Sequence, residues 1–193
     1  MYIGKIVNSS SHIDYVCQVY GPGEVEQTPR PEDHGFGTFV GIERADEGYL
    51  VGVISNTTLL NPDFGNLGPR LSPEEDLGIF SPDYLNEKVT LVAVVALGTV
   101  NGSDVQQGVP VVAAAIDARV RTLTEDETIA FHCAEGNLRL AYLPMLATMR
   151  NPLAPHLTLN IIDHLSRLFP HEAQRLAILG GNLAWHARVE PVG

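Results

Sequence analysis

The 193-residue sequence has few cysteines, few cationic residues and no long hydrophobic run. Its two cysteines, Cys17 and Cys133, are too few to form the disulfide framework of a small secreted domain. The longest apolar runs, such as 91–97, are far shorter than the roughly 20 residues of a membrane-spanning helix. The N-terminus also lacks the basic segment and apolar stretch of a secretory signal. These absences predict a cytoplasmic protein that does not contact membranes.

The cationic residues are scattered as well as scarce. The chain has 12 Lys and Arg against 23 Asp and Glu, a formal net charge of −11. Most of the excess lies in residues 1–124, which hold 16 acidic and 7 basic side chains. Binding to a nucleic-acid backbone requires clustered Lys and Arg that displace counterions. Because the sequence has no such cluster, we expect no direct binding to DNA or RNA.

Short segments rich in β-branched residues predict strands in the first 120 or so residues. They lie at 2–7, 12–20, 37–42, 49–55, 89–97 and, as one or two strands broken at Pro110, at 109–120. Segment 89–97 is apolar on both faces, which predicts a central strand, and 98–108 is expected to be a polar connection. Six or seven short strands separated by turns are typical of a small β-barrel, closed or partly open.

A long excursion rich in Pro, Gly and Asn, residues 56–88, interrupts the strands. Loops of this length are commonly functional, so the excursion is a candidate contact surface. In the alternative interpretation, the excursion only covers an open end of the barrel. The candidate interaction residues within it are Asn61, Asp63, Phe64, Leu67 and Arg70.

Helical spacing replaces the strand pattern at Thr124, where Thr124 and Glu127 form the signature of a capping box. The sequence predicts four short helices, at about 125–135, 138–149, 156–169 and 170–179, the last ended by Gly180 and Gly181. Pro144 is expected to kink or weaken the second helix. The predicted fold class is therefore α+β, with a barrel domain at 1–122 and a helical domain at 123–193.

The first half resembles a HAS-barrel, the small β-barrel at the N-termini of hexameric DNA-translocating ATPases and of ATP synthase subunits. The matching segments are 3–7, 37–40, 50–54, 92–98 and 108–120. The resemblance implies a role in ring assembly or docking, since that barrel has no chemistry of its own. The phosphate-binding motif of the ATPase core, G-x-x-x-x-G-K-[ST], is missing from the sequence, so the chain would be an accessory or adaptor and not the motor.

The sequence contains no convincing cofactor or metal motif. The glycines of 35–41 approach a dinucleotide fingerprint, but the third is one place late and no helix follows, so they are expected to be turn glycines. Five histidines lie in the second half, without the short spacing that prepares a zinc site: His132, His156, His164, His171 and His186. Cys133 follows His132, but helix neighbours point about 100° apart, which favours a small buried cysteine over a catalytic thiol.

Asp33 and His34 are the weak catalytic candidates, because they adjoin in a loop bounded by Pro and Gly. An Asx-type turn is the favoured structural explanation of this pair. Three functions remain open. The first is a non-catalytic assembly or adaptor protein that binds a protein partner or itself as a homo-oligomer. The second is a small hydrolase that uses Asp33 and His34 or the C-terminal histidines. The third is a ligand-binding barrel lined by strands 13–19 and 91–97.

Overall fold

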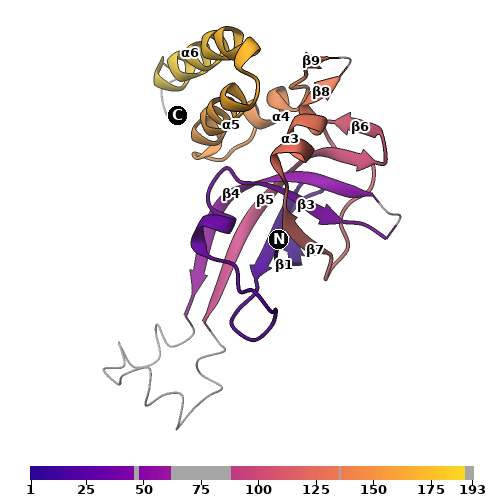
Figure 1. Cartoon of the computed structure of the whole chain (residues 1–193). Coiled ribbons are helices and arrows are strands. Elements are labelled where there is room, and N and C mark those ends of the chain that lie inside the picture. The colour runs from indigo at the N-terminus through magenta and orange to yellow at the C-terminus, as the bar shows by residue number, and fades with distance from the viewer. Residues whose placement is uncertain (46–47, 62–87, 135, 190–193) are drawn as a thin grey trace.

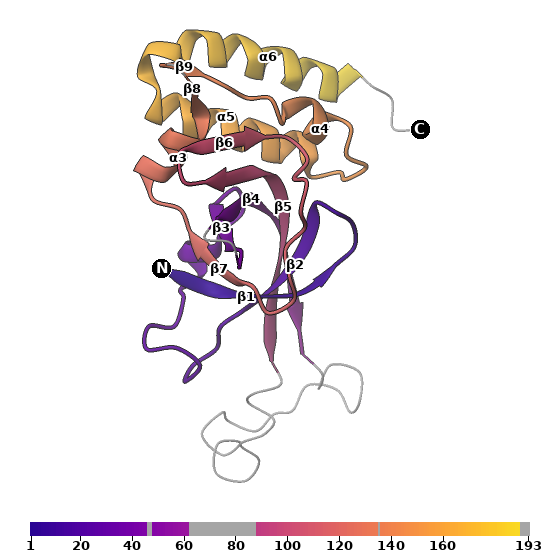
Figure 2. The ribbon, with the colours of Figure 1, turned by 90° about the vertical axis from the view of Figure 1, so that its right-hand side faces the viewer.

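The computed structural model describes residues 1–45, 48–61, 88–134 and 136–189, and the side chains up to 183. It confirms the predicted α+β class (Figure 1). Antiparallel strands form a closed barrel, and the helices lie together on one side of it. Two long strands, β4 (Tyr49–Leu60) and β5 (Val89–Asn101), extend away from the helices, as a second view shows (Figure 2).

Seven strands of the described chain form one antiparallel sheet. They are β1 (Tyr2–Ser9), β2 (Asp14–Val19), β3 (Phe39–Glu43), β4 (Tyr49–Leu60), β5 (Val89–Asn101), β6 (Asp104–Gln107) and β7 (Arg119–Thr122). Their order is β2-β1-β7-β3-β4-β5-β6, and a further pairing of β2 with β5 closes a six-stranded barrel. Strand β6 is left outside this barrel and pairs with β5 alone.

The second half of the described chain is mainly helical. Its elements are α3 (Glu125–His132), a hairpin of β8 (Cys133–Ala134) and β9 (Asn137–Leu138), α4 (Leu143–Ala147), α5 (Ala154–Leu168), a 3-10 turn η2 (Pro170–Glu172) and α6 (Ala173–Val189). An earlier 3-10 turn, η1 (Pro31–His34), lies between β2 and β3.

Strand β5 explains how the two halves share their apolar residues. Its alternate residues Val92, Val94 and Ala96 are fully buried inside the barrel. Val95 and Leu97 point to the other face, where they belong to a second core cluster. Successive side chains of a strand point to opposite faces, so a strand that is apolar on both faces must be covered on both. The expectation that this segment is central is therefore confirmed.

The second core cluster lies between the outer face of the barrel and the helices. Its buried members from the barrel are Phe39, Val51, Val53, Val95, Leu97 and Val100, and those from the helical half include Phe131, Tyr142, Leu146, Leu157, Ile161 and Leu165. Helix α5 contributes an amphipathic face, as the sequence predicted. The division at residue 122 stays a prediction about folding units, but the helical half has no separate apolar core among the described residues.

The start of α3 follows the prediction, and the segment after it does not. Thr124 accepts a hydrogen bond from the Glu127 amide and Glu127 bonds the Thr124 amide in return, which confirms the capping box. The helix ends at His132 and not near 135, and most of 138–149 is not helical. Pro144 lies in the first turn of the short helix α4, where its missing amide proton costs nothing, so it begins a helix instead of kinking one.

Helix α6 is also longer than predicted, since it continues through Gly180 and Gly181 to Val189. Neither glycine has the positive φ of a helix-ending residue. Gly180 instead faces α5, where an added Cβ would lie 3.5 Å from Ile162 and 3.8 Å from Leu159. The glycine therefore permits close helix packing, a tertiary role that local sequence signals do not distinguish from a helix stop.

Strand boundaries differ from the prediction on both sides of β6. Residues 98–108 are not a polar connection, because β5 runs on to Asn101 and turns into β6. Residues 109–118 are not a strand either, and pairing resumes only at β7. Residues 56–60, expected to open the excursion, continue β4, whereas 62–87 fall outside the described residues. Within the described chain, no helix has both the length and the apolar character needed to cross a membrane.

A substitution at Gly4 tests the closeness of the barrel strands. A Cβ at this position of β1 would lie 2.1 Å from the carbonyl oxygen of Gln18 on β2, so the strands would have to separate. We expect Gly4→Ala to lower the free energy of unfolding in urea by about 1–3 kcal/mol. The matched control is Gly181→Ala, whose Cβ would meet nothing within 4 Å and which should stabilise the helix by up to about 1 kcal/mol. Equal effects of the two changes would contradict the close approach.

Candidate interaction surface

The two catalytic candidates lie in the turn η1, where one of them has a structural role. The Asp33 carboxylate accepts a hydrogen bond of 2.8 Å from the Arg30 amide, so it closes its own turn. His34 lines a hollow of about 460 Å³ with Tyr20 and Pro31 among its neighbours. This arrangement agrees with the favoured turn explanation.

The C-terminal histidines are dispersed. His132 is fully buried, His164 is partly buried, and His156 and His171 are exposed on separate elements. Over the part of the chain that the structure describes, no three His, Cys, Asp or Glu side chains come close enough to hold a metal ion. The side chain of His186 lies outside the described part.

Cys133 does not occupy the buried position that its sequence context favoured. It is exposed at the start of β8, whereas Cys17 is buried in the barrel, where burial raises the pKa of its thiol to about 12. The preceding His132 points into the core, away from the cysteine's exposed position. The reason is that α3 ends at His132, so adjacent residues belong to a helix and to a surface hairpin.

His132 instead pairs with a tyrosine ten residues away. Its Nδ1 lies 2.7 Å from the Thr128 carbonyl oxygen and its Nε2 lies 2.8 Å from the Tyr142 hydroxyl. A carbonyl can only accept, so Nδ1 carries the proton and Nε2 accepts from Tyr142. Both side chains are fully buried, and burial lowers the pKa of His132 to about 4 and raises that of Tyr142. The pair is neutral and satisfied, which suits a structural role in the core.

The His132 pair connects the barrel with the helices. The ring of Phe39 on β3 packs nearly perpendicular to two imidazoles, with its centroid 5.1 Å from that of His132 and 5.6 Å from that of His164 on α5. Burial and the nearby Arg167 lower the pKa of His164, against the opposing effect of Glu125 and Asp163. One aromatic side chain of the barrel thus contacts α3 and α5 at the same place.

Gln107 provides a second connection, from strand β6. Its side-chain nitrogen donates to the carbonyl oxygens of Phe131 and Arg139, each at 2.9 Å. Its side-chain oxygen accepts from the Ala141 amide at 2.8 Å. A single amide side chain therefore satisfies three backbone groups on both sides of the β8–β9 hairpin.

The segment from Val109 to Ala118, called the strap here, crosses from β6 to β7 (Figure 2). His12 Nε2 donates to the Pro110 carbonyl oxygen at 2.8 Å, and the Ala114 amide donates to the Tyr15 hydroxyl at 3.0 Å. At its end, Asp117 and Ala118 exchange backbone hydrogen bonds of 2.9 Å with Ile6. The strap is therefore fixed to β1 and to the residues around β2 at intervals along its length.

The outward face of the strap is apolar. Four large aliphatic side chains on it are exposed: Val109, Val111, Val112 and Ile116. The alanines Ala114 and Ala118 are partly buried and pack against the barrel core. Exposed apolar patches commonly mark protein contact sites, especially where the backbone that carries them is held in place. The corresponding signal in the sequence is the uncharged run Gly108–Ile116, most of which was predicted to be a strand.

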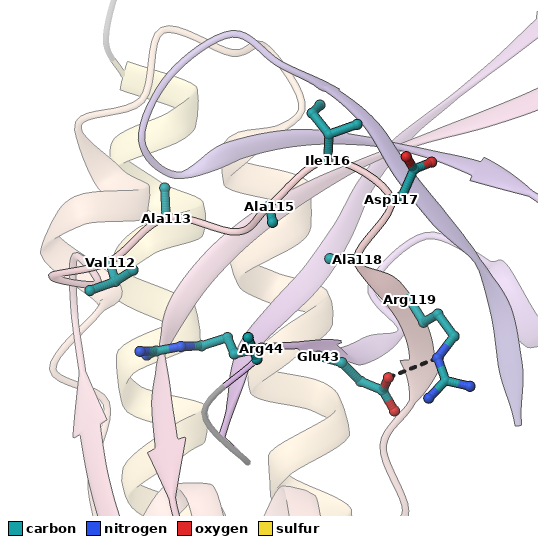
Figure 3. A pocket seen from close by; sticks show the side chains of 10 residues that line it. Glu43, Arg44, Val112, Ala113, Ala115, Ile116, Asp117, Ala118 and Arg119 are labelled. Carbon is teal, nitrogen blue, oxygen red and sulfur yellow. Dashed lines mark hydrogen bonds and ion pairs between the residues drawn. The ribbon is translucent and has the colours of Figure 1, made fainter.

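A hollow of about 590 Å³ lies between the strap and the end of β3 (Figure 3). The side of the hollow that the strap forms is lined by short side chains, those of Ala113, Ala115 and Ala118. Its charged residues are two acids and two bases: Glu43, Arg44, Asp117 and Arg119. Arg119 pairs with Glu43 at 2.9 Å, and Asp117 with Lys5 at 3.4 Å. The rim is thus locally neutral on a chain of net charge −11.

A smaller apolar hollow, of about 400 Å³, lies on the helical half between α6 and the segment around Leu140. It is lined mainly by leucines and by the exposed Ile178. Of the interaction residues that the sequence suggested, Asn61 is exposed at the end of β4. Asp63, Phe64, Leu67 and Arg70 lie outside the described residues.

Comparison with known proteins gives a family. A family model with the description "Domain of unknown function (DUF8166)" matches residues 1–192. No curated protein matches the chain.

Removal of the Gln107 side chain tests the link between barrel and helices. We expect Gln107→Ala to lower the free energy of unfolding by about 1–3 kcal/mol, because three hydrogen bonds to the backbone are lost, one of them partly buried. Gln106→Ala is the matched control, since Gln106 is exposed and bonds only to nearby Asp104. Urea unfolding measures both, and an equal loss would show that the link contributes nothing.

The buried histidine predicts a loss of stability in mild acid. The unfolded chain protonates His132 near pH 6.5, whereas the folded chain does so only near its lowered pKa of about 4. The contribution of the neutral His132 to the free energy of unfolding is therefore complete above pH 6.5. It is lost as the pH falls toward 4, by about 3 kcal/mol in total. His164 acts in the same direction. Urea unfolding across this window, with NMR of the imidazole ring, measures the effect. A His132 ring that titrates near its ordinary pKa would contradict it.

Proposed function

The chain belongs to the DUF8166 family, and we propose that it is a non-catalytic assembly or adaptor protein that docks another protein surface through the strap. The observation that carries the proposal is the exposed aliphatic face of 109–116 on a backbone held by hydrogen bonds to His12, Tyr15 and Ile6. A fixed apolar surface loses little conformational entropy on binding, which favours a stable interface.

The interior of the barrel supports docking over ligand binding. Side chains of β2 and β5 that face inward, such as Tyr15, Cys17 and Val94, are almost completely buried in one cluster. A barrel filled by its own side chains leaves no room for a ligand in its interior. Asp33 closes its own turn and His132 is neutral and buried, which favours structural roles for these two residues.

The resemblance of 1–122 to a HAS-barrel also supports an assembly role, because that barrel acts in ring assembly and docking. On this proposal the protein is an accessory to a ring-shaped ATPase or DNA-processing complex, and it works in the cytoplasm. The acidic chain would reach nucleic acid through its partner and not directly.

Affinity capture with paired variants tests the proposal. The tagged protein is used as wild type, as Ile116→Asp in the strap, and as Ile178→Asp on α6; these isoleucines are 63% and 62% exposed. We expect specific partner chains, including a second copy with another tag, to be recovered with the wild type and Ile178→Asp and lost with Ile116→Asp. Recovery that does not depend on Ile116 would contradict docking through the strap. Circular dichroism checks that both variants fold.

A further inference from the structure

We infer that the strap binds a second copy of this chain, and that two straps pack against each other about a two-fold axis. This inference rests on the proposed function and names its partner. Three observations carry it: the combination of protruding and recessed apolar features on one surface, the charge of that surface, and the chemistry of the other possible occupants.

The shape of the surface is self-complementary. Ile116 and Val112 project from the strap as exposed aliphatic side chains, and they border the hollow of about 590 Å³ (Figure 3). The alanines beside them leave this hollow open. In a two-fold interface the same patch meets itself, so a projecting residue of each copy must enter a recess of the other. The strap carries both features within a few residues.

The charge of the surface also favours a second copy. Two chains of net charge −11 repel each other, and at physiological salt that repulsion acts mainly between groups within about 8 Å. The hollow is lined by equal numbers of acidic and basic residues, and two of its charged groups, Glu43 and Arg119, pair with each other. Two copies therefore meet there at little electrostatic cost.

The other occupants fit less well. A basic protein would be drawn to an acidic surface, whereas the hollow beside the strap is lined by equal numbers of acidic and basic residues. An anionic membrane needs clustered Lys and Arg and is favoured by interfacial aromatic residues. The exposed large side chains of the strap are Val and Ile alone. A second copy presents the same apolar side chains and the same hollow, so it is the occupant that fits this surface best.

Light scattering over a range of protein concentrations tests the inference with the full chain. We expect the wild type to approach twice the chain mass of 20.9 kDa. Ile116→Asp should weaken self-association at least about tenfold, equal to about 1.4 kcal/mol. Ile178→Asp adds the same charge at an equally exposed isoleucine of α6 and should leave self-association unchanged. Added salt should strengthen the wild-type dimer, because it screens the repulsion between the chains.

The outcomes separate this inference from the proposed function. A dimer that persists in Ile116→Asp would overturn the two-fold strap interface, and so would an oligomer larger than a dimer. A wild type that stays monomeric, but captures a different protein in an Ile116-dependent way, would overturn the second copy and keep the docking function. A monomer without any Ile116-dependent capture would overturn both.

Discussion

The packing of the helices against the outer face of the barrel is the interaction on which the rest of the structure depends. Strand β5 has no polar face, since Val94 and Ala96 fill the barrel while Val95 and Leu97 lie under the helices. Without that cover the barrel would expose a broad apolar wall, and without the wall α5 would have nothing to bury its amphipathic face against. The two halves therefore depend on each other for the burial of their apolar residues, although their sequence patterns differ.

Polar groups at this contact give it a defined geometry. A buried polar group without a partner costs free energy, so the buried His132–Tyr142 pair favours one arrangement of α3 over others of similar apolar area. The three bonds of Gln107, nearer the surface, hold the β8–β9 hairpin in the same arrangement. Protonation of His132 removes this fit, which makes the contact between the halves sensitive to acid. The outside of the barrel away from the helices, including the strap, is left free for another role.

Local patterns predicted the features that depend on neighbouring residues. The barrel strands, the capping box at Thr124 and the amphipathic helix α5 all arise within a few residues of sequence. The errors arose where distant contacts decide. Gly180 fits against α5 inside a helix, and Tyr142 selects His132 as its partner across the hairpin. The strap escaped prediction because an apolar extended run is the same in sequence whether it pairs in a sheet or lies exposed on one.

The strap is the feature that turns this fold into a proposed function, because its anchors hold an apolar face outward. Hydrogen–deuterium exchange of 109–116, followed as the protein concentration rises, tests this claim most directly. We predict slower exchange in this segment at high concentration and no change at 175–182 of α6. Exchange in 109–116 that is fast and independent of both concentration and added partner would contradict the account.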